Sequence, residues 1–555
     1  MSIHLRAALA ALALMPAAAD AAPAAPRVSP DLAESAARIE AHVRFLADDL
    51  LEGREAGTRG FDLAALYVAT QFRLLGLEPG GEQGGFFQTV PLLSGRLLEE
   101  GARLAVTRGL STSELVFDED FVPAINFDTG TCALEAPMVF VGHGVHAPEL
   151  QYDDFAGVDV WGKVAVLLAN APARFPADQR AFHASGQEKL RELERRGAAG
   201  VIFLGDPESE ARRAWALNAG NWARPGMRVL GADGRPLDTF PGLGCRVSVR
   251  VQRADVFFEG AAHSADEVWE MLAEGRLRAF DLPGRIALAS TAHLAPVSSR
   301  NVVARVPGSD ARLAAEHVVL TAHLDHLGIG APRDGDAIYN GAHDNAVGIA
   351  ILLEAGRMLG HDRARLRRSV LLVATTAEEK GLLGARHFVE RPTVPLGSIV
   401  ANVNMDMPLP FTEVLDVVPT GIEHSTLDAV ARRAIARAGL GLTPDPLPEE
   451  VTFVRSDQYP FVRAGIPAVY LKSGVRPSDG SDGLAQVKAF RASVYHLPND
   501  DLTQPFDWPT AARLAKVNQW IALEVSNAAQ RPAWKPGNFF GGKFGGRLEE
   551  HDPHD

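Results

Sequence analysis

The sequence predicts an α/β fold in which a mostly parallel central sheet is covered by helices on both faces. From Asn301 onward, short apolar runs alternate regularly with amphipathic helix patterns. Strands that alternate with helices are typical of parallel sheets, because each crossover helix packs back onto the sheet. The chain has 555 residues, of which 46% are hydrophobic, enough for two to four ordinary globular domains.

The expected elements follow one another in a simple order. Two helices open the chain, one from Asp31 with apolar residues at helical spacing through Leu50, and one over 64–75 that ends at Gly76. After Asn301 we expect strands at 318–322, 369–375, 399–405 and 468–472, and helices at 345–359, 381–390, 425–438 and 509–526.

A middle segment interrupts this pattern. Strands are expected at 138–144, 162–168 and 199–204, with a helix over 189–196 before the last of them. This βαβ-like unit resembles an insertion into the larger fold. Its histidines are scattered along the chain, so we expect no site there.

Both termini carry segments of biased composition. Arg6, the apolar stretch 7–15 and Ala19-Asp20-Ala21 together predict a secretory signal peptide that is cleaved near Ala21. The alternative is an Ala-rich N-terminal helix. We therefore expect a periplasmic or secreted protein without membrane insertion, and a tail over 531–555, rich in Gly, Pro and charge, that does not pack.

The charge and the cysteines narrow the possible partners and the redox setting. The net charge of −14 argues against nucleic acid or an anionic membrane as the main partner. The two cysteines are Cys132 and Cys245, and in an exported protein they are able to form a disulfide. Two separate buried thiols are an equally good interpretation of the sequence.

Chemically active side chains gather where the expected strands end. In open α/β sheets, ligands bind beyond the carboxyl ends of the strands. The segments in that position are His323-Leu324-Asp325, Asp344, Glu378-Glu379, Asp406 and Tyr495-His496. Histidine nitrogen and carboxylate oxygen are the ligands that Zn²⁺ takes, and this set suffices for two ions if one carboxylate bridges them. Asp344 is the best bridging candidate, because it follows a glycine closely and precedes a helix N-terminus.

The adjacent pair Glu378-Glu379 suggests a division of labour. Neighbouring side chains point in different directions, so one carboxylate is able to hold metal while the other accepts a proton. A solvated acidic pair at the start of a helix is the alternative interpretation of these two residues alone.

Six segments together resemble the co-catalytic two-zinc aminopeptidase family, which also contains the glutamate carboxypeptidases. They are TAHLDHLG, IYNGAHDNAVG, ATTAEEKGLLGARHF, NVNMD, RSDQYPFVRAGIPA and YHLPNDD, and they span roughly residues 300–505. FLADDLLEGREAGTRGFDLAALYVATQF resembles the opening helices of that family, and VGHGVHAPELQYDDFAGVDVWGKVAVLL is similar to an inserted protease-associated domain. The resemblance implies a zinc exopeptidase fold with a peptidase domain over 30–130 and 285–530, interrupted by a protease-associated domain over 131–265.

The resemblance also implies a role for each site residue. His323, Asp344 and Asp406 would hold one zinc ion, and Asp344, Glu379 and His496 the other. Glu378 would be the general base, Asp325 would orient His323 through the second ring nitrogen, and Asp457 would lie near the substrate or support the ligands. Period-two alternation turns His326 away from His323, so we expect His326 to serve packing or loop hydrogen bonds.

The implied activity is that of a secreted or periplasmic zinc exopeptidase. We expect an aminopeptidase that hydrolyses N-terminal residues from peptides through a water activated by two Zn²⁺ per chain. A carboxypeptidase, a dipeptidase or another amide hydrolase on the same scaffold is the alternative, and a non-enzymatic binding protein is a third interpretation. The sequence contains no G-x-S-x-G and no H-E-x-x-H, which disfavours a serine hydrolase and a zincin.

Overall fold

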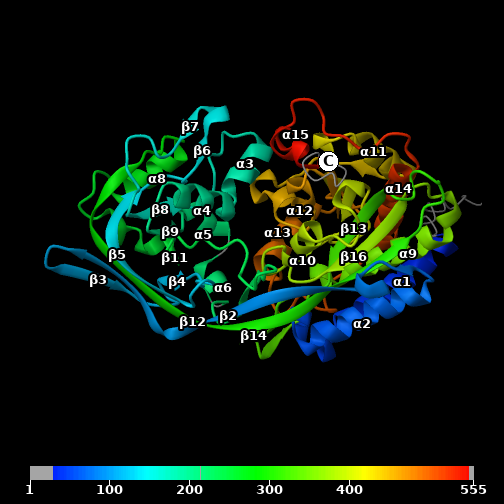
Figure 1. Ribbon diagram of the computed structural model, residues 1–555, viewed down its shortest axis with the longest axis horizontal. Helices are drawn as coiled ribbons and strands as arrows, with labels where there is room; N and C mark the ends of the chain where they lie inside the picture. The colour runs from blue at the N-terminus through cyan, green and yellow to red at the C-terminus, as the bar shows by residue number, and fades with distance from the viewer. Residues whose placement is uncertain (1–28, 213, 220, 549–555) are drawn as a thin grey trace, which may run out of the picture.

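The chain folds into two lobes that share two very long strands (Figure 1). The computed structural model describes residues 29–212, 214–219 and 221–548. The predicted signal peptide lies outside the described residues. We call residues 29–95 and 296–548 the main lobe and residues 96–295 the second lobe, because the largest buried apolar cluster of each lies within it. Two smaller clusters contain residues of both lobes.

The main lobe is built around a mostly parallel sheet, as predicted. Its strand order is β19-β18-β20-β17-β13-β16-β12, and the four central strands β20, β17, β13 and β16 run parallel to one another. The strands are β12 (Phe280–Val306), β13 (His317–His323), β16 (Ser369–Thr375), β17 (Ile399–Asn404), β18 (Asp416–Thr420), β19 (Gly441–Leu442) and β20 (Ala468–Ser473). Because the central strands are parallel, their carboxyl ends meet at one edge of the sheet.

Helices cover both faces of this sheet, as the alternating side chains require. Val318 and Leu320 of β13 enter one apolar cluster, and Val319 between them enters the opposite one. The first face is covered by α1 (Pro30–Leu46), α2 (Arg59–Leu74), α9 (Val347–His361), α11 (Leu427–Arg437) and α14 (Trp508–Asn527). The second face is covered by α10 (Leu383–Glu390) and α12 (Gln458–Arg463). The mixed α/β class predicted from the sequence is confirmed.

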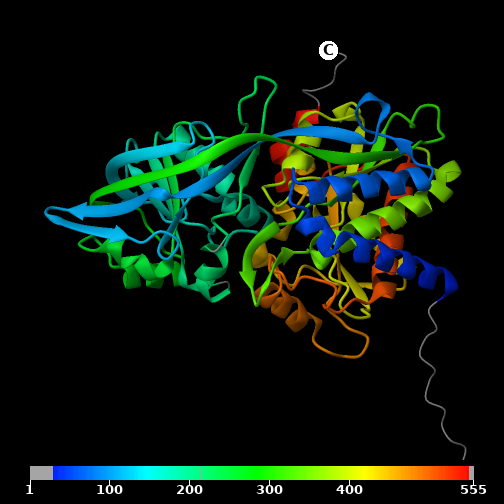
Figure 2. The ribbon, with the colours of Figure 1, turned by 90° about the horizontal axis from the view of Figure 1, so that it is seen from below.

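Two long strands connect the lobes. β2 (Phe87–Arg108) and β12 pair antiparallel almost from end to end, and Figure 2 shows this ribbon crossing the length of the molecule. β12 pairs with β16 in the main lobe and with β5 in the second lobe. One hydrogen-bonded ladder therefore passes through both lobes.

The second lobe has a small parallel sheet of its own. β5 (Thr131–Phe140), β8 (Val164–Leu168), β9 (Gly200–Leu204) and β11 (Cys245–Val249) run parallel, with α4 (Gly186–Arg195) preceding β9. Cys132 and Cys245 form a disulfide between β5 and β11, with Cα atoms 5.4 Å apart. The apolar cluster of this lobe extends from Leu104 to Leu288, beyond the predicted limits 131–265, because the long strands supply part of it.

The prediction that the tail after Arg531 does not pack is wrong for residues 531–548. Phe540 and Phe544 of α15 (Phe539–Phe544) are buried, and Trp534 donates from its indole nitrogen to the carbonyl of Gly465 at 2.8 Å. Three aromatic side chains outweigh the Gly- and Pro-rich composition of the segment. Residues 549–555 lie outside the described part of the chain. Among the described helices, none is sufficiently long and apolar to cross a lipid bilayer.

Candidate metal centre

The carboxyl edge of the main sheet brings all five predicted metal ligands together. His323 is the last residue of β13, and Asp406 follows β17. Glu379 follows β16, Asp344 lies in the turn before α9, and His496 follows α13 (Gly483–Ser493). Segments far apart in the chain thus meet because neighbouring parallel strands end side by side.

Asp344 lies at the centre of this group, and its two oxygens face different histidines. Its Oδ1 is 3.2 Å from Nε2 of His323, and its Oδ2 is 3.2 Å from Nε2 of His496. On one side, His323 Nε2 is also 3.2 Å from Asp406 Oδ1. On the other side, His496 Nε2 is 3.1 Å from Glu379 Oε2. The group therefore divides into two half-sites that share Asp344.

The turn that carries Asp344 is held by a residue that the sequence analysis did not single out. Asp500 accepts the backbone N–H groups of His343 and Asp344 at 2.9 and 3.0 Å. Gly341 has φ of +60°, and a Cβ there would lie 2.2 Å from the backbone oxygen of Asp344. Glycine is required at this position both by the backbone angle and by the close approach.

Asp325 supports the site differently from the prediction. His323 Nδ1 contacts the backbone oxygen of Asp325 at 3.1 Å, not its carboxylate. The carboxylate instead accepts the backbone N–H groups of Glu378 and Glu379, at 3.1 and 3.3 Å. The predicted geometry fails because β13 ends at His323, so strand alternation does not extend to Asp325. Asp325 fixes the backbone of the acidic pair.

His326 lies beside the candidate ligands Glu379 and Asp344, a position that the sequence did not predict. Its Nδ1 is 2.8 Å from Glu379 Oε1 and 4.0 Å from Asp344 Oδ2. The three residues could offer donor atoms that all lie within 4.8 Å of one another. His326 does have a hydrogen-bonding role, as expected, but its side-chain partner is the candidate metal ligand Glu379.

Electrostatics at the centre favour a bound cation. Burial raises the pKa of Glu378 well above its usual range, and the carboxylates of Asp406 and Glu379 act in the same direction against the attraction of His323. Within the described residues, no Lys or Arg forms an ion pair with Asp344, Glu379 or Asp406. Buried carboxylates without basic partners are costly, so the donor set fits divalent metal of the nitrogen- and oxygen-binding type.

Two further buried residues support the site from behind. Asp457 is fully buried and accepts a hydrogen bond from Oγ1 of Thr375, the last residue of β16, so it supports the strand end. Arg54, also buried, donates to the carbonyl oxygens of Leu324, Leu46, Asn340 and Gly341. It thereby joins the N-terminal segment to the loop that follows His323 and to the turn that precedes Asp344. The apolar periodicity of the N-terminal helices does not predict this role.

Comparison with known proteins agrees with this geometry. Residues 301–521 match the sequence model of Peptidase family M28. A probable zinc metalloprotease of Leptosphaeria maculans is 28% identical over 333 residues, which are 52% of this chain and 72% of that protein. Leupeptin-inactivating enzyme 1 of Streptomyces exfoliatus is 29% identical over 214 residues, which are 37% of this chain and 43% of that enzyme.

A solved structure supports the fold over most of the chain. An aminopeptidase from Aneurinibacillus sp. strain AM-1 aligns with a TM-score of 0.52 and 17% identity, covering 88% of this chain and 93% of that one. Because the identity is only 17%, this similarity is evidence for the fold alone. The metallopeptidase family predicted from the sequence is confirmed by the family match: residues 301–521 form a Peptidase family M28 domain, and the chain is a metallopeptidase.

Proposed function

We propose that this protein is an exported two-zinc aminopeptidase that removes N-terminal residues from peptides. The observation that carries the proposal is the position of Asp344, whose two oxygens each face a different histidine at 3.2 Å. A carboxylate shared in this way suits two metal ions. His323, Asp344 and Asp406 would hold one ion, and Asp344, Glu379 and His496 the other.

The chemistry follows from the metals and from one protein carboxylate. Two zinc ions in such a site polarise a carbonyl group and lower the pKa of a bound water. Glu378 has no hydrogen-bond partner for its carboxylate among the described contacts, while its backbone is fixed by Asp325. The raised pKa of Glu378, due first to burial, suits a group that takes up a proton and later gives it to the leaving amine.

Excess carboxylate near the metals favours a substrate with a free amino group. Glu378 and Glu379 form one group of donor atoms with His323, and Asp406 forms another with His323 and Asp344. An N-terminal ammonium group would find complementary charge there. A dipeptidase or carboxypeptidase is the second candidate, because positively charged side chains also line a pocket beside Asp406.

The second lobe is proposed to be a protease-associated domain that limits access to the site. In support, Arg224 lies with its guanidinium 3.8 Å from the ring centre of Tyr339. Tyr339 belongs to the hairpin of β14 (Gly328–Arg333) and β15 (Asp336–Tyr339), next to the loop of His326.

Metal content and substrate blocking test the proposed activity. We expect elemental mass spectrometry to find about two zinc ions per chain. Removal of the metal with a chelator should abolish turnover. Leucine 4-nitroanilide should be cleaved, and N-acetyl-leucine 4-nitroanilide should not. One zinc per chain would refute the two-metal site, and equal cleavage of the blocked substrate would refute the aminopeptidase assignment.

A further inference from the structure

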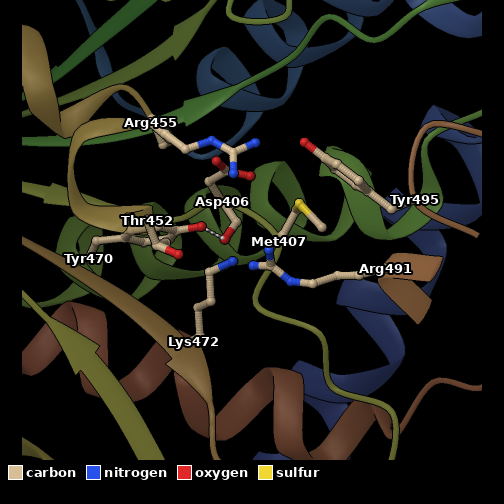
Figure 3. A pocket seen from close by; sticks show the side chains of 9 residues that line it. Asp406, Met407, Thr452, Arg455, Tyr470, Lys472, Arg491 and Tyr495 are labelled. Carbon is tan, nitrogen blue, oxygen red and sulfur yellow. Dashed lines mark hydrogen bonds between the residues drawn. The ribbon is translucent and has the colours of Figure 1, made fainter. Parts of the chain in front are cut away.

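Beside the metal centre lies a pocket lined by three positively charged side chains. It is bounded by Asp406, Thr452, Arg455, Tyr470, Lys472 and Arg491. Figure 3 shows the charged ends of Lys472 and Arg491 facing the same space. Asp406 lines both this pocket and the first half-site, and Tyr470 donates from its hydroxyl to the backbone oxygen of Asp406 at 2.6 Å.

Lys472 has no acidic partner within the described part of the chain. It extends from β20, and the contact found for its ammonium group is with the ring of Tyr470, whose centre is 5.1 Å away. Burial, followed by repulsion from Arg491, lowers the pKa of Lys472 to about 8. Asp445 lies across a neighbouring pocket that Lys472 also lines, but its Oδ1 accepts the backbone N–H of Leu447 at 2.9 Å.

The two arginines share one carboxylate. Glu450 Oε2 is 2.8 Å from Nη1 of Arg491 and 3.4 Å from Nη1 of Arg455. Nε of Arg491 is buried and has no hydrogen-bond partner. Among the described residues, Glu450 is thus the one carboxylate that forms an ion pair with any of the three cations. Asp406 and Asp445 attract Lys472 without forming an ion pair with it.

We propose that this pocket receives a carboxylate of the substrate, so that the enzyme prefers acidic peptides. Like charges held together in a partly buried pocket repel one another, and an anion between them forms strong charge-assisted hydrogen bonds. The proposal rests on the proposed function for the position of the reacting bond. It names the substrate class that the metal centre alone leaves open.

The carboxylate has two sources that the same chemistry would recognise. One is the side chain of an N-terminal Glu or Asp, and the other is the free terminus of a short peptide. Glutamate, glutamine and leucine 4-nitroanilides lack a free terminus and so report the side chain alone. The dipeptide Ala-Ala and its amide differ in the terminal carboxylate alone.

Substitutions in the pocket test the proposal with a matched control. Lys472→Met and Arg491→Met should each lower kcat/KM for the preferred acidic substrate about ten- to hundredfold, and change that for leucine 4-nitroanilide little. Lys488→Met is the control. Lys488 is an exposed lysine on α13, the helix that also carries Arg491, and it does not line the pocket. Equal kcat/KM for glutamate and glutamine anilides, together with equal cleavage of the dipeptide and its amide, would overturn the proposal.

Binding without turnover separates this proposal from the proposed function. Titration calorimetry with L-glutamate, L-glutamine and L-glutamine amide measures recognition of each carboxylate even if no peptide is cleaved. Tighter binding of a carboxylate form, lost in Lys472→Met and kept in Lys488→Met, supports the pocket whatever the activity. Cleavage of leucine 4-nitroanilide with no preference for any carboxylate would leave the aminopeptidase standing and refute the pocket.

Discussion

Two buried carboxylates, Asp344 and Glu354, lie just before and within α9, and they differ in what surrounds them. Asp344, before α9, faces His323 and His496 and has no Lys or Arg partner among the described residues. Glu354, within α9, accepts hydrogen bonds from Ser35 at 2.6 Å, Arg38 Nε at 3.0 Å and Arg357 Nη2 at 2.8 Å.

The difference teaches which buried acid is structural. Although burial alone would raise the pKa of Glu354, the hydrogen bonds from Arg357, Arg38 and Ser35 lower it to about 2. Glu354 is thus neutralised within the chain and fastens α1 to α9. Asp344, Glu379 and Asp406 contact histidines but no Lys or Arg among the described residues, and this arrangement suits a bound cation.

The largest expected effect is the loss of turnover in Glu378→Gln. If Glu378 moves a proton, kcat should fall about 10²- to 10⁴-fold, while the zinc content stays at the wild-type value because the ligands remain. Steady-state kinetics and metal analysis measure the two quantities. Near wild-type turnover would contradict a role of Glu378 in proton transfer and leave it a structural residue like Glu354.

The second largest effect is a loss of stability without a loss of turnover, in Glu354→Gln. Glu354→Gln should lower the free energy of unfolding by about 2–4 kcal/mol, since Arg38 and Arg357 lose their charged partner. Urea unfolding measures this change, and kcat at 25 °C should stay near the wild-type value. A strong loss of kcat without loss of stability would contradict the comparison.

The smallest effect concerns acid stability. The folded pKa of Glu354, about 2, lies below the model-peptide value of about 4.3. Its contribution is therefore present above about pH 4.5 and is lost as the pH falls toward 2. The wild type should lose up to about 1.4 kcal/mol more stability per pH unit in that window than Glu354→Gln. If the urea midpoints of the two proteins fell by the same amount from pH 5 to pH 3, the result would contradict this contribution of Glu354.

Much of the main lobe was predictable because its pattern is local. The apolar runs at β13, β16, β17 and β20 and the helical repeats between them specify a parallel sheet, and the sheet places the ligands. α13 was missed because Phe490 is one of few buried residues in it, so its pattern is weak. Leu50 was expected on the first helix, but α1 ends at Leu46 and Leu50 is 80% exposed.

The errors at the site arise where the chain leaves regular structure. The positions of Asp325 and His326 depend on the turn after β13, which strand periodicity does not describe. Asp500 acts through backbone N–H groups, which carry no side-chain signal in the sequence. The ligand roles inferred from the family resemblance stay predictions until metal analysis tests them.

The shared ladder of β2 and β12 limits how the second lobe can be removed or exchanged. Excision of residues 131–265 would delete β5 and leave the matching edge of β12 without hydrogen-bond partners. It would also leave Leu104 and Leu288 without most of their apolar cluster. A shortened enzyme should therefore be joined within the ribbon itself, for example between Gly95 and Leu294, which are partners across β2 and β12. In engineering terms, the second lobe is an extension of one hairpin rather than a detachable module.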